Sequence, residues 1–378
     1  MSIAADHETH GLVPPPWAPD CWAEEDQAEL VCRTVLDITH DVKTFVFGAP
    51  DGGVFHFEPG QFITLQLEID GHPINRCYTI SSPPTRPHLI SITVKRVLGG
   101  PVSNWLHDNV TPGTKLTVLA PLGQFTLASP VRKKYLFLSA GSGITPVMSM
   151  TRALSDLGSD ADIVFVHNAR TPADIIFRRE LEAIAAVQPN IKVVHICEGD
   201  YPSERWMGLR GRLSAAALQA IVPDLSERVT YTCGPPAYMA AVRRILTESG
   251  YDLADYHEES FDFESLPAGE QQAREAEQPA DGDGSDGAAE EASFTIEFVR
   301  SRKTVTCGAK QFVLDAALAA GLRPPSSCSQ GMCGTCKTVM LEGSVDMQHN
   351  GGIRPKEVAA GKILICCSTP LSDLRIEA

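Results

Sequence analysis

The chain has 378 residues, enough for two or three domains, and its 43% hydrophobic and 21% charged residues are typical of globular proteins. No run reaches the roughly eighteen apolar residues of a membrane span and the N-terminus lacks a signal-peptide pattern, so we expect a cytoplasmic protein without a membrane partner. The net charge of −15 is concentrated in residues 1–25 and 264–292, which carry −5 and −8, so it gives no indication of nucleic-acid binding.

The N-terminal third is predicted to be rich in short β-strands. Residues 1–25 form a disordered arm in this interpretation, and the folded segment spans 26–130. Gly- and Pro-rich turns separate alternating or apolar runs at Val42–Phe47, Gln61–Leu67, Leu89–Lys95 and Lys115–Leu119. Several short strands at this spacing predict a small antiparallel β-barrel.

Strands and helices alternate over residues 131–263, which predicts an α/β domain with an open parallel sheet. The expected strands are Tyr135–Ala140, Ile163–Asn168, Ile191–Ile196 and Val229–Cys233. Helices are expected after each of them, ending near Leu157, Val187, Ile221 and Glu248.

Residues 264–292 consist mainly of Pro, Gly, Ala, Gln and acids, which predicts an acidic flexible linker without a core. The chain is expected to fold again over 293–378, a segment with a charge of +3. Alternating Phe294, Ile296 and Phe298 predict a half-buried strand there. A helix over Phe312–Ala320 is expected to end at Gly321, which can adopt the left-handed cap conformation.

Four cysteines in this last segment have the spacing of a plant-type [2Fe–2S] ferredoxin. Cys328, Cys333 and Cys336 follow a C-x4-C-x2-C pattern, and 29 residues separate Cys336 from Cys366. Gly331 and Gly334 between them would let the backbone approach the cluster and direct N–H groups at its sulfurs. With eleven cysteines in a reducing compartment, metal binding is expected rather than disulfides.

Two other interpretations of these cysteines stay open. Buried structural thiols would be an oxidation liability, and zinc sites favour ligands in close pairs rather than three and a remote one. Cys367 is also a candidate fourth ligand because it adjoins Cys366. Ferredoxins place a proline four residues after the ligand, and by that resemblance Pro370 selects Cys366 and turns Cys367 to the other side of a strand.

A second motif lies in the barrel segment, where Arg76-Cys77-Tyr78-Thr79 is followed by Ser81 and Ser82. An arginine here can pair with a phosphate, and a tyrosine can stack on a ring system. The motif resembles the R-x-Y-[ST] flavin signature of the ferredoxin–NADP reductase superfamily. The resemblance implies that Thr79 to Ser82 face the polar edge of the flavin. An Arg-x-Tyr sequence on a strand is, by itself, usually only part of the exposed surface. The motif therefore indicates a flavin site only in combination with the motif that follows it.

The motif that follows is a glycine turn before a predicted helix. Its candidate cofactor residues are Val94, Lys95, Gly99, Gly100, Val102 and Ser103. Such a turn can bind the pyrophosphate of a flavin. The turn resembles the FAD-binding members of the superfamily, and FMN is the alternative.

Two motifs at the carboxyl ends of predicted parallel strands indicate a pyridine-nucleotide site. They supply the candidate residues Gly141, Ser142, Gly143, Thr145 and Pro146 from one strand, and Cys233, Gly234 and Pro235 from another. In the superfamily the cysteine of the C-G-P motif lies beside the nicotinamide, which implies that role for Cys233. A buried structural thiol is the alternative.

Arg170 resembles the residue that contacts the adenosine end of the nucleotide. An arginine there serves NADH or NADPH, but no cluster of cationic residues suits a 2′-phosphate, so we expect NADH. By the same resemblance, Glu258 and Phe261 lie near the reactive face of the flavin, although this stretch could be only the start of the linker. The residues expected to take part directly in electron transfer are Tyr78, Ser81, Cys233, Glu258 and Phe261.

Over residues 26–378 the chain resembles flavin reductases with a C-terminal plant-type ferredoxin that serve Rieske-type non-haem iron oxygenases. The resemblance implies an oxidoreductase that passes electrons from NADH through flavin and [2Fe–2S] to such an oxygenase. It also implies that the oxygenase N-demethylates a quaternary ammonium compound such as glycine betaine. The alternatives are a reductase for a hybrid-cluster protein and a redox-sensing module.

Overall fold

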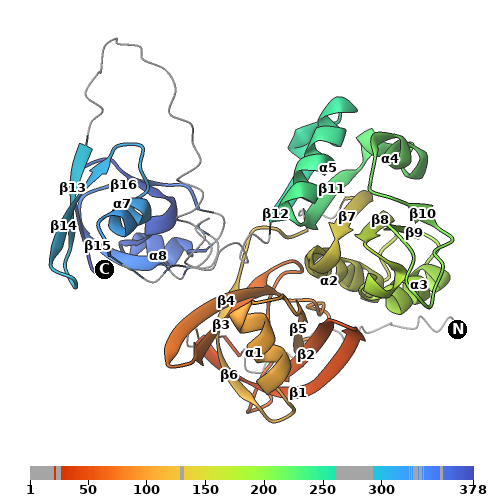
Figure 1. Ribbon diagram of the computed structural model, residues 1–378, viewed down its shortest axis with the longest axis horizontal. Helices are drawn as coiled ribbons and strands as arrows, with labels where there is room; N and C mark the ends of the chain where they lie inside the picture. Colours follow the sequence, from red (N-terminus) through yellow and green to blue (C-terminus); the bar gives the residue numbers. More distant parts are fainter. Residues whose placement is uncertain are drawn as a thin grey trace, which may run out of the picture. The chain divides into compact units, whose positions relative to one another are not determined.

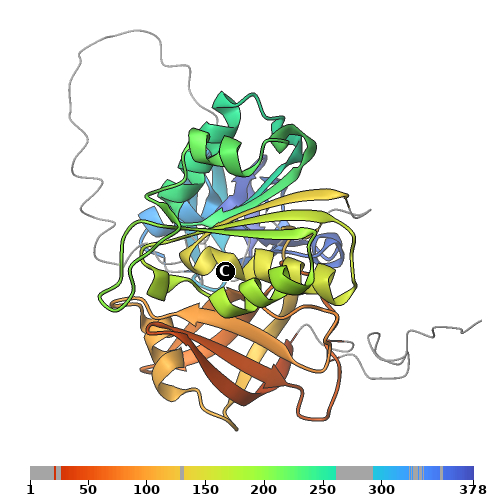
Figure 2. The ribbon, with the colours of Figure 1, turned by 90° about the vertical axis from the view of Figure 1, so that its right-hand side faces the viewer.

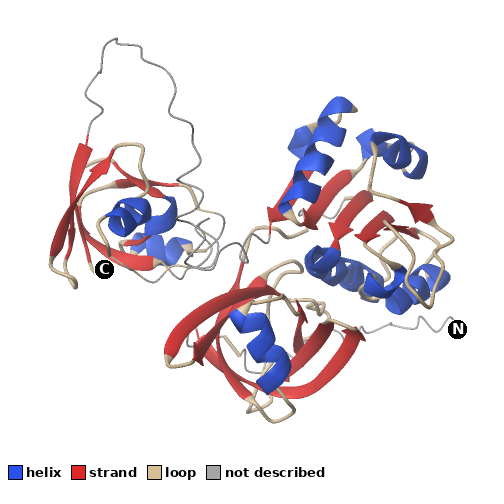
Figure 3. Ribbon diagram, in the orientation of Figure 1, coloured by secondary structure: helices blue, strands red, loops and turns tan. Residues whose placement is uncertain are grey.

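A computed structural model describes residues 21–22, 27–127, 132–260, 293–322, 324, 326, 331, 334, 336–349 and 352–378. The chain divides into two compact units, residues 1–261 and 262–378. Figure 3 shows how strands and helices are distributed in each unit. No described helix is long and apolar enough to cross a membrane.

The first part of the first unit is a six-stranded antiparallel barrel (Figure 1). Its strands in spatial order are β4 (His72–Thr79), β3 (Phe62–Ile69), β6 (Lys115–Leu122), β1 (Gln27–Thr39), β2 (Val42–Gly48) and β5 (Ile90–Lys95). A bridge between Ile80 and Ile92 joins the two end strands. The inward residues are apolar, and Val102 and Leu106 of helix α1 (Pro101–Asn109) pack into the same core. The predicted barrel is confirmed.

The N-terminal arm was predicted to include residues 1–25, but two of these residues pack against the barrel. The Cys21 N–H donates a hydrogen bond to the Val54 carbonyl at 2.8 Å. The Trp22 ring lies 5.5 Å from the ring of Phe55. The apolar surface of Trp22 explains this contact, because it contributes more by packing on the barrel core than by remaining in water.

The second part of the first unit is a parallel sheet (Figure 2). Its strands in order are β10 (Leu209–Arg210), β9 (Ile191–Cys197), β8 (Asp162–Ala169), β7 (Lys134–Ala140), β11 (Val229–Gly234) and β12 (Tyr256–Ser260). Helices α2 (Ile144–Asp156) and α3 (Arg178–Val187) cover one face, and α4 (Ala215–Ile221) and α5 (Pro236–Glu248) cover the other. Because both faces are covered, β7 and β8 are apolar on both sides.

The sequence did not indicate β12, since Tyr256–Ser260 was interpreted as the end of the domain rather than as a strand. Barrel and sheet also contact each other directly. The ring of Phe125 lies 5.5 Å from the ring of Tyr231, and the Tyr231 hydroxyl donates to the Thr126 carbonyl at 3.1 Å.

The second unit has a five-stranded sheet and a separate two-stranded one (Figure 1). The larger sheet contains, in order, β14 (Lys303–Gly308), β13 (Ser293–Phe298), β19 (Leu374–Ile376), β15 (Lys337–Glu342) and β17 (Lys362–Leu364), and β16 (Val345–Met347) pairs with β18 (Ser368–Pro370). Helix α7 (Val313–Ala319) packs into its core, and α8 (Pro355–Ala359) precedes β17. Gly321 follows α7 with a φ of 76°, as the helix-capping prediction required.

Candidate functional site

The flavin motif lies on β4, the strand paired with β3. Alternation along the strand places Cys77 in the barrel interior, where its Sγ lies 3.3 Å from the Thr64 hydroxyl. Arg76 and Tyr78 alternate with Cys77 and are partly exposed. The structure therefore places a cation and an aromatic ring on the same side of one strand, next to the buried Thr79.

The two serines after this motif use their hydroxyls inside the protein. Ser81 is fully buried, and its Oγ lies 2.9 Å from both the Ser91 and the Thr93 hydroxyls. The Ser82 Oγ accepts a hydrogen bond from the Ser91 N–H at 3.0 Å. These hydroxyls join the end of β4 to β5, so the Ser81 and Ser82 side chains are held by contacts within the protein.

The predicted glycine turn precedes α1. Gly99 has a φ of 75°, and Gly100 is the N-cap of α1. The Ser103 Oγ accepts from the Val97 N–H at 3.2 Å and so holds the turn against the helix. The first N–H groups of a helix have no intrahelical acceptor, and the first turn of α1, which includes Val102, carries no acidic residue. This end of α1 fits a phosphate group.

Two further predicted cofactor residues lie on β5. Val94 is buried in the barrel, and its carbonyl lies 2.9 Å from the His107 Nε2. The Lys95 ammonium lies 3.2 Å from the Asp41 carboxylate. The Val94 side chain is packed in the barrel core and the Lys95 ammonium has a carboxylate partner, so both side chains are held by contacts within the protein.

The predicted nucleotide loop connects β7 to α2. Gly141, Ser142 and Gly143 form one turn of 3-10 helix, and the Thr145 hydroxyl donates to the Ser142 carbonyl at 3.2 Å. Pro146 lies in the first turn of α2, where its missing N–H costs no hydrogen bond.

Gly143 touches the second nucleotide motif. A Cβ at this position would lie 2.4 Å from the Cys233 carbonyl oxygen and 2.6 Å from the Gly234 nitrogen. Cys233 and Gly234 end β11, and Pro235 is the N-cap of α5. The two motifs are 90 residues apart in sequence, and the structure brings their backbones into contact.

A row of polar side chains crosses the sheet at this edge. The strand registers pair Glu259 with Cys233 and Cys233 with Ser139. Burial raises the pKa of the Cys233 thiol well above its ordinary value, and the Glu259 carboxylate raises it further, so the thiol is neutral. Burial also raises the pKa of Glu259 from 4.5 to about 8, and within the described residues its Oε2 has no hydrogen-bond partner.

Glu259, the neighbour of the predicted Glu258, lies beside Cys233. Glu258 occupies the opposite face of β12, where it forms an ion pair with Arg243 of α5 and accepts from the Tyr256 hydroxyl at 2.7 Å. Side chains alternate along a strand, so only one of two adjacent acids can face the nucleotide motifs. From the sequence alone, Glu259 could be preferred to Glu258 only by predicting the register between their strand and the strand of Cys233. Phe261 lies outside the described residues.

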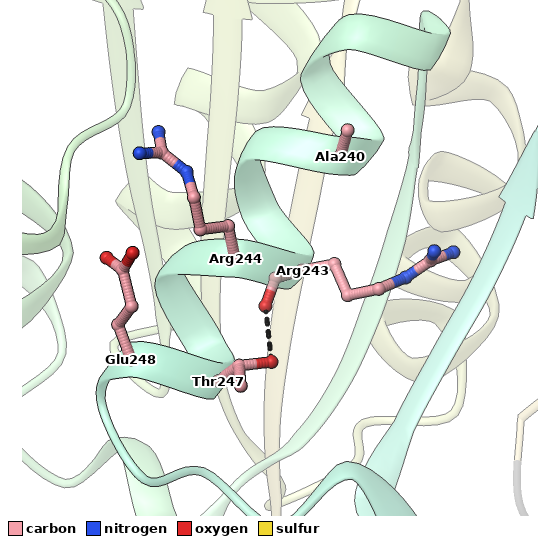
Figure 4. A pocket seen from close by; sticks show the side chains of 5 residues that line it. All are labelled: Ala240, Arg243, Arg244, Thr247 and Glu248. Atoms are coloured by element: carbon pink, nitrogen blue, oxygen red, sulfur yellow. Dashed lines mark hydrogen bonds between the residues drawn. The ribbon is translucent and has the colours of Figure 1, made fainter. Parts of the chain in front are cut away.

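The exposed side of α5 has a shallow hollow of about 430 Å³ (Figure 4). It is lined by Ala240, Arg243, Arg244, Thr247 and Glu248, and the Thr247 hydroxyl donates to the Arg243 carbonyl at 2.9 Å. None of the predicted cofactor residues lines this hollow, which is formed by side-chain stems on one helix.

Arg170 follows β8 at the same carboxyl edge as the nucleotide motifs, and its side chain is exposed. Its carbonyl accepts from the Gly199 N–H at 2.9 Å, which links the ends of β8 and β9. Glu198 therefore lies near the predicted adenosine end of the nucleotide site.

The described part of the predicted cluster site consists of Cys336, Cys366 and the two glycines. Cys336 and Cys366 are both buried, and the Ile365 N–H donates to the Cys336 carbonyl at 3.4 Å. The Gly331 N–H donates to the Cys366 Sγ at 3.3 Å. Gly331 and Gly334 have φ angles of 67° and 71°. These residues fit a thiolate ligated to iron and stabilised by a backbone N–H. Cys328 and Cys333 lie outside the described residues.

Cys366 and Cys367 were expected to alternate on a strand, and the structure corrects this expectation. Residues Ile365–Cys367 form a turn of 3-10 helix between β17 and β18. The Cys367 Sγ lies 3.6 Å from the Leu364 carbonyl, and a Cβ on Gly331 would lie 2.7 Å from this sulfur. The turn, rather than strand alternation, separates the two sulfurs.

Three family matches cover the folded segments. Residues 29–127 match the oxidoreductase FAD-binding domain, residues 137–244 the oxidoreductase NAD-binding domain, and residues 297–371 the 2Fe-2S iron-sulfur cluster binding domain. These matches show FAD, NADH and [2Fe–2S] as the cofactors of the chain.

Known proteins match over nearly the whole length. The glycine betaine monooxygenase reductase subunit of Chromohalobacter salexigens is 46% identical, over 92% of this chain and 94% of its own. The stachydrine N-demethylase reductase subunit of Rhizobium meliloti is 40% identical, over 94% of this chain and 98% of its own.

A solved structure is similar over nearly the whole chain. Phthalate dioxygenase reductase, a modular structure for electron transfer from pyridine nucleotides to [2Fe–2S], is 25% identical and has a TM-score of 0.56. The similarity covers 93% of this chain and 98% of that one. The chain therefore belongs to the oxidoreductase family of monooxygenase reductase subunits, in which FAD-binding, NAD-binding and 2Fe-2S domains follow one another in a single polypeptide.

Proposed function

We propose that this chain is the cytoplasmic reductase of a two-component monooxygenase whose partner is a Rieske-type oxygenase that N-demethylates a quaternary ammonium compound such as glycine betaine. The observation that supports it most is the contact between the Gly143 and Cys233 motifs, on the same compact unit as the flavin strand β4. The relatives named above, similar over more than nine-tenths of the chain, support the choice of partner and substrate.

Each part of the proposed site has its own task. When bound, a flavin supplies the conversion between two-electron nicotinamide chemistry and one-electron iron–sulfur chemistry. Tyr78 offers a ring for stacking, and Arg76 together with the N-terminus of α1 offers positive charge to phosphate groups. The Gly331 N–H stabilises negative charge on the Cys366 sulfur.

The buried Cys233 and Glu259 form an uncharged floor under the nicotinamide position. With a pKa of about 8, Glu259 holds a proton at neutral pH, so both side chains exclude water without introducing negative charge beside the redox site. The proton on Glu259 is also available for transfer near that position.

Reconstitution tests the proposal. The purified chain, a Rieske-type oxygenase, NADH and oxygen should convert glycine betaine to dimethylglycine and formaldehyde. The yield should depend on all four components. If NADH reduces the chain but no Rieske-type oxygenase turns over, whereas a hybrid-cluster protein is reduced, the proposed partner is wrong.

NADH is expected to give a higher kcat/KM than NADPH, by on the order of tenfold or more. Glu198 follows β9 at the nucleotide edge of the sheet, where a carboxylate can accept from a ribose hydroxyl and repels a 2′-phosphate. Its ion pair with Arg212 is exposed and therefore weak, whereas Asp200 is held by Arg210 and the Trp206 N–H. Steady-state kinetics with both nucleotides checks the preference. A clear NADPH preference would contradict it.

Replacing Glu259 with glutamine should make the protein relatively more stable as the pH rises. The carboxyl of Glu259 has a folded-state pKa of about 8 against 4.5 when exposed, so the unfolded chain releases this proton at lower pH. Wild-type stability should therefore fall, relative to E259Q, between pH 4.5 and 8 and then level off.

Thermal unfolding of the two proteins across this pH range measures the difference. The control is Glu258→Gln, which alters the ion pair with Arg243 and should not reproduce the trend. A Tm difference between wild type and E259Q that does not change with pH would show that Glu259 is not held neutral.

A further inference from the structure

Three side chains of α2 bond the segment that follows the flavin motif, two of them through its main-chain carbonyls. The Ser149 hydroxyl donates to the Ser82 carbonyl at 2.7 Å, and the Arg152 Nη1 donates to the Ser81 carbonyl. Asp156 accepts from the Thr85 hydroxyl at 2.5 Å and from Arg86 at 2.6 and 2.8 Å. Residues 149, 152 and 156 share one face of the helix, so this face is a continuous contact between the sheet domain and the barrel.

Arg152 is the buried cation in this contact, with 10% of its side chain exposed. Its Nε and Nη2 donate to the two carboxylate oxygens of Glu180 on α3, at 2.7 and 2.6 Å. The guanidinium lies 4.5 Å from the ring centre of Phe177. Three partners therefore fix the planar group in one orientation, with Nη1 directed at the Ser81 carbonyl.

Phe177 strengthens this arrangement. It has a φ of 57° and is the N-cap of α3, an unusual conformation for an aromatic residue. Its ring is buried against the α2 and α3 side of the core. The surface on which Arg152 rests is thus part of the packed core, and it limits how far the guanidinium can move.

The two ends of this contact belong to different cofactor sites. Helix α2 begins at Ile144, directly after the Gly141–Gly143 turn of the nucleotide site. Ser81 lies two residues after Thr79, the end of the flavin strand β4. A displacement of Ser81 relative to α2 would change the separation of the flavin and nicotinamide positions. Rates of this kind fall by roughly a hundredfold for a misplacement of about 1 Å.

We infer that Arg152 is a positioning residue for hydride transfer: its bond to the Ser81 carbonyl sets the separation between the flavin segment and the nucleotide loop. The inference rests on the proposed function, because it requires that NADH reduces a flavin at this site. It assigns no chemical role to Arg152, which acts through the main chain of Ser81.

Arg152→Met tests the inference, because methionine keeps part of the volume and removes all the donors. In anaerobic stopped-flow experiments the limiting rate of flavin reduction should fall at least tenfold, while the Kd of NADH stays within twofold. The long-wavelength charge-transfer absorbance between nicotinamide and flavin should weaken, a change that lower stability alone would not produce.

Arg86→Met is the matched control, since Arg86 also bonds the same face of α2 but has 58% of its side chain exposed. Its limiting rate should stay within twofold of wild type. Arg152→Met combined with Glu180→Gln removes the carboxylate charge that the single variant leaves unpaired. The double variant should recover stability but not the rate or the charge-transfer band.

A measurement without flavin gives an independent readout. In the FAD-free protein, amide hydrogen exchange of residues 80–92 should be faster in the Arg152→Met variant than in Arg86→Met. If Arg152→Met does not fold, Arg152→Lys carries the test, because lysine can reach Ser81 or Glu180 but cannot bond both as the guanidinium does. Its rate should lie below wild type with an unchanged Kd.

Equal rates for the Arg152 and Arg86 variants, or a rate recovered by the double variant, would overturn the inference. Failure of the proposed function is a separate outcome: wild-type flavin would then not be reduced by NADH at all. In every variant, electron transfer from a dithionite-reduced cluster to the oxygenase should be unchanged.

Discussion

Replacing Cys366 with serine is expected to abolish the visible absorbance of the iron–sulfur cluster and to lower electron delivery to the partner by more than ~100-fold. The Cys366 sulfur is buried and accepts a hydrogen bond from the Gly331 N–H, an environment that suits the proposed cluster ligand. Flavin reduction by NADH should persist, because the barrel and the parallel sheet form a compact unit separate from residues 262–378. Absorbance and EPR spectra of the purified variant, with rapid-mixing kinetics, measure both effects.

Cys367→Ser is the matched control at the adjacent position. The Cys367 sulfur is directed toward the Leu364 carbonyl, and serine is small enough to occupy the same space. The cluster spectrum should therefore be retained. Loss of the cluster in the Cys367 variant and its retention in the Cys366 variant would reverse the ligand assignment.

Replacing Gly143 with alanine should lower NADH-dependent flavin reduction by roughly 100-fold. The added methyl group would lie 2.4 to 2.6 Å from backbone atoms of Cys233 and Gly234, so the nucleotide loop and the end of β11 must separate. Backbone atoms in a parallel sheet cannot rotate aside as a flexible side chain can. Stopped-flow reduction by NADH measures the loss, and thermal unfolding reports the accompanying decrease in stability.

Gly199→Ala is the control on the same edge of the sheet. An added Cβ there meets no atom within 4 Å, and the backbone conformation does not require glycine. Reduction by NADH should stay near the wild-type rate. If Gly143→Ala behaved like this control, the contact between the two nucleotide motifs would have no role in binding.

The sequence predicted the fold correctly in those segments where a single local constraint determines the structure. The alternating and apolar runs identified β2, β3, β5 and β6 of the barrel and β7, β8, β9 and β11 of the parallel sheet, and Gly321 has the left-handed backbone expected of it. Cysteine spacing indicated the cluster because ligand geometry restricts the spacing, and the 2Fe-2S family match over residues 297–371 agrees with it.

The remaining features depend on contacts between distant segments. The choice between Glu258 and Glu259 is fixed by the register of β12 on β11, and a shift of one residue would exchange their faces. Arg152 meets the Ser81 carbonyl across 71 residues of sequence. Ser81 turns its hydroxyl into the barrel because Ser91 and Thr93 lie there. No local pattern contains this information.

An anaerobic titration with NADH, followed by absorbance and EPR, tests most directly whether electrons pass from nicotinamide through flavin to the cluster in this chain. One equivalent of NADH carries two electrons, and the cluster accepts one. We predict that NADH bleaches the flavin and that the EPR signal of a reduced [2Fe–2S] cluster then appears without any added mediator. A flavin that bleaches fully while the cluster remains oxidised, even after excess NADH, would contradict the proposed route of electron transfer.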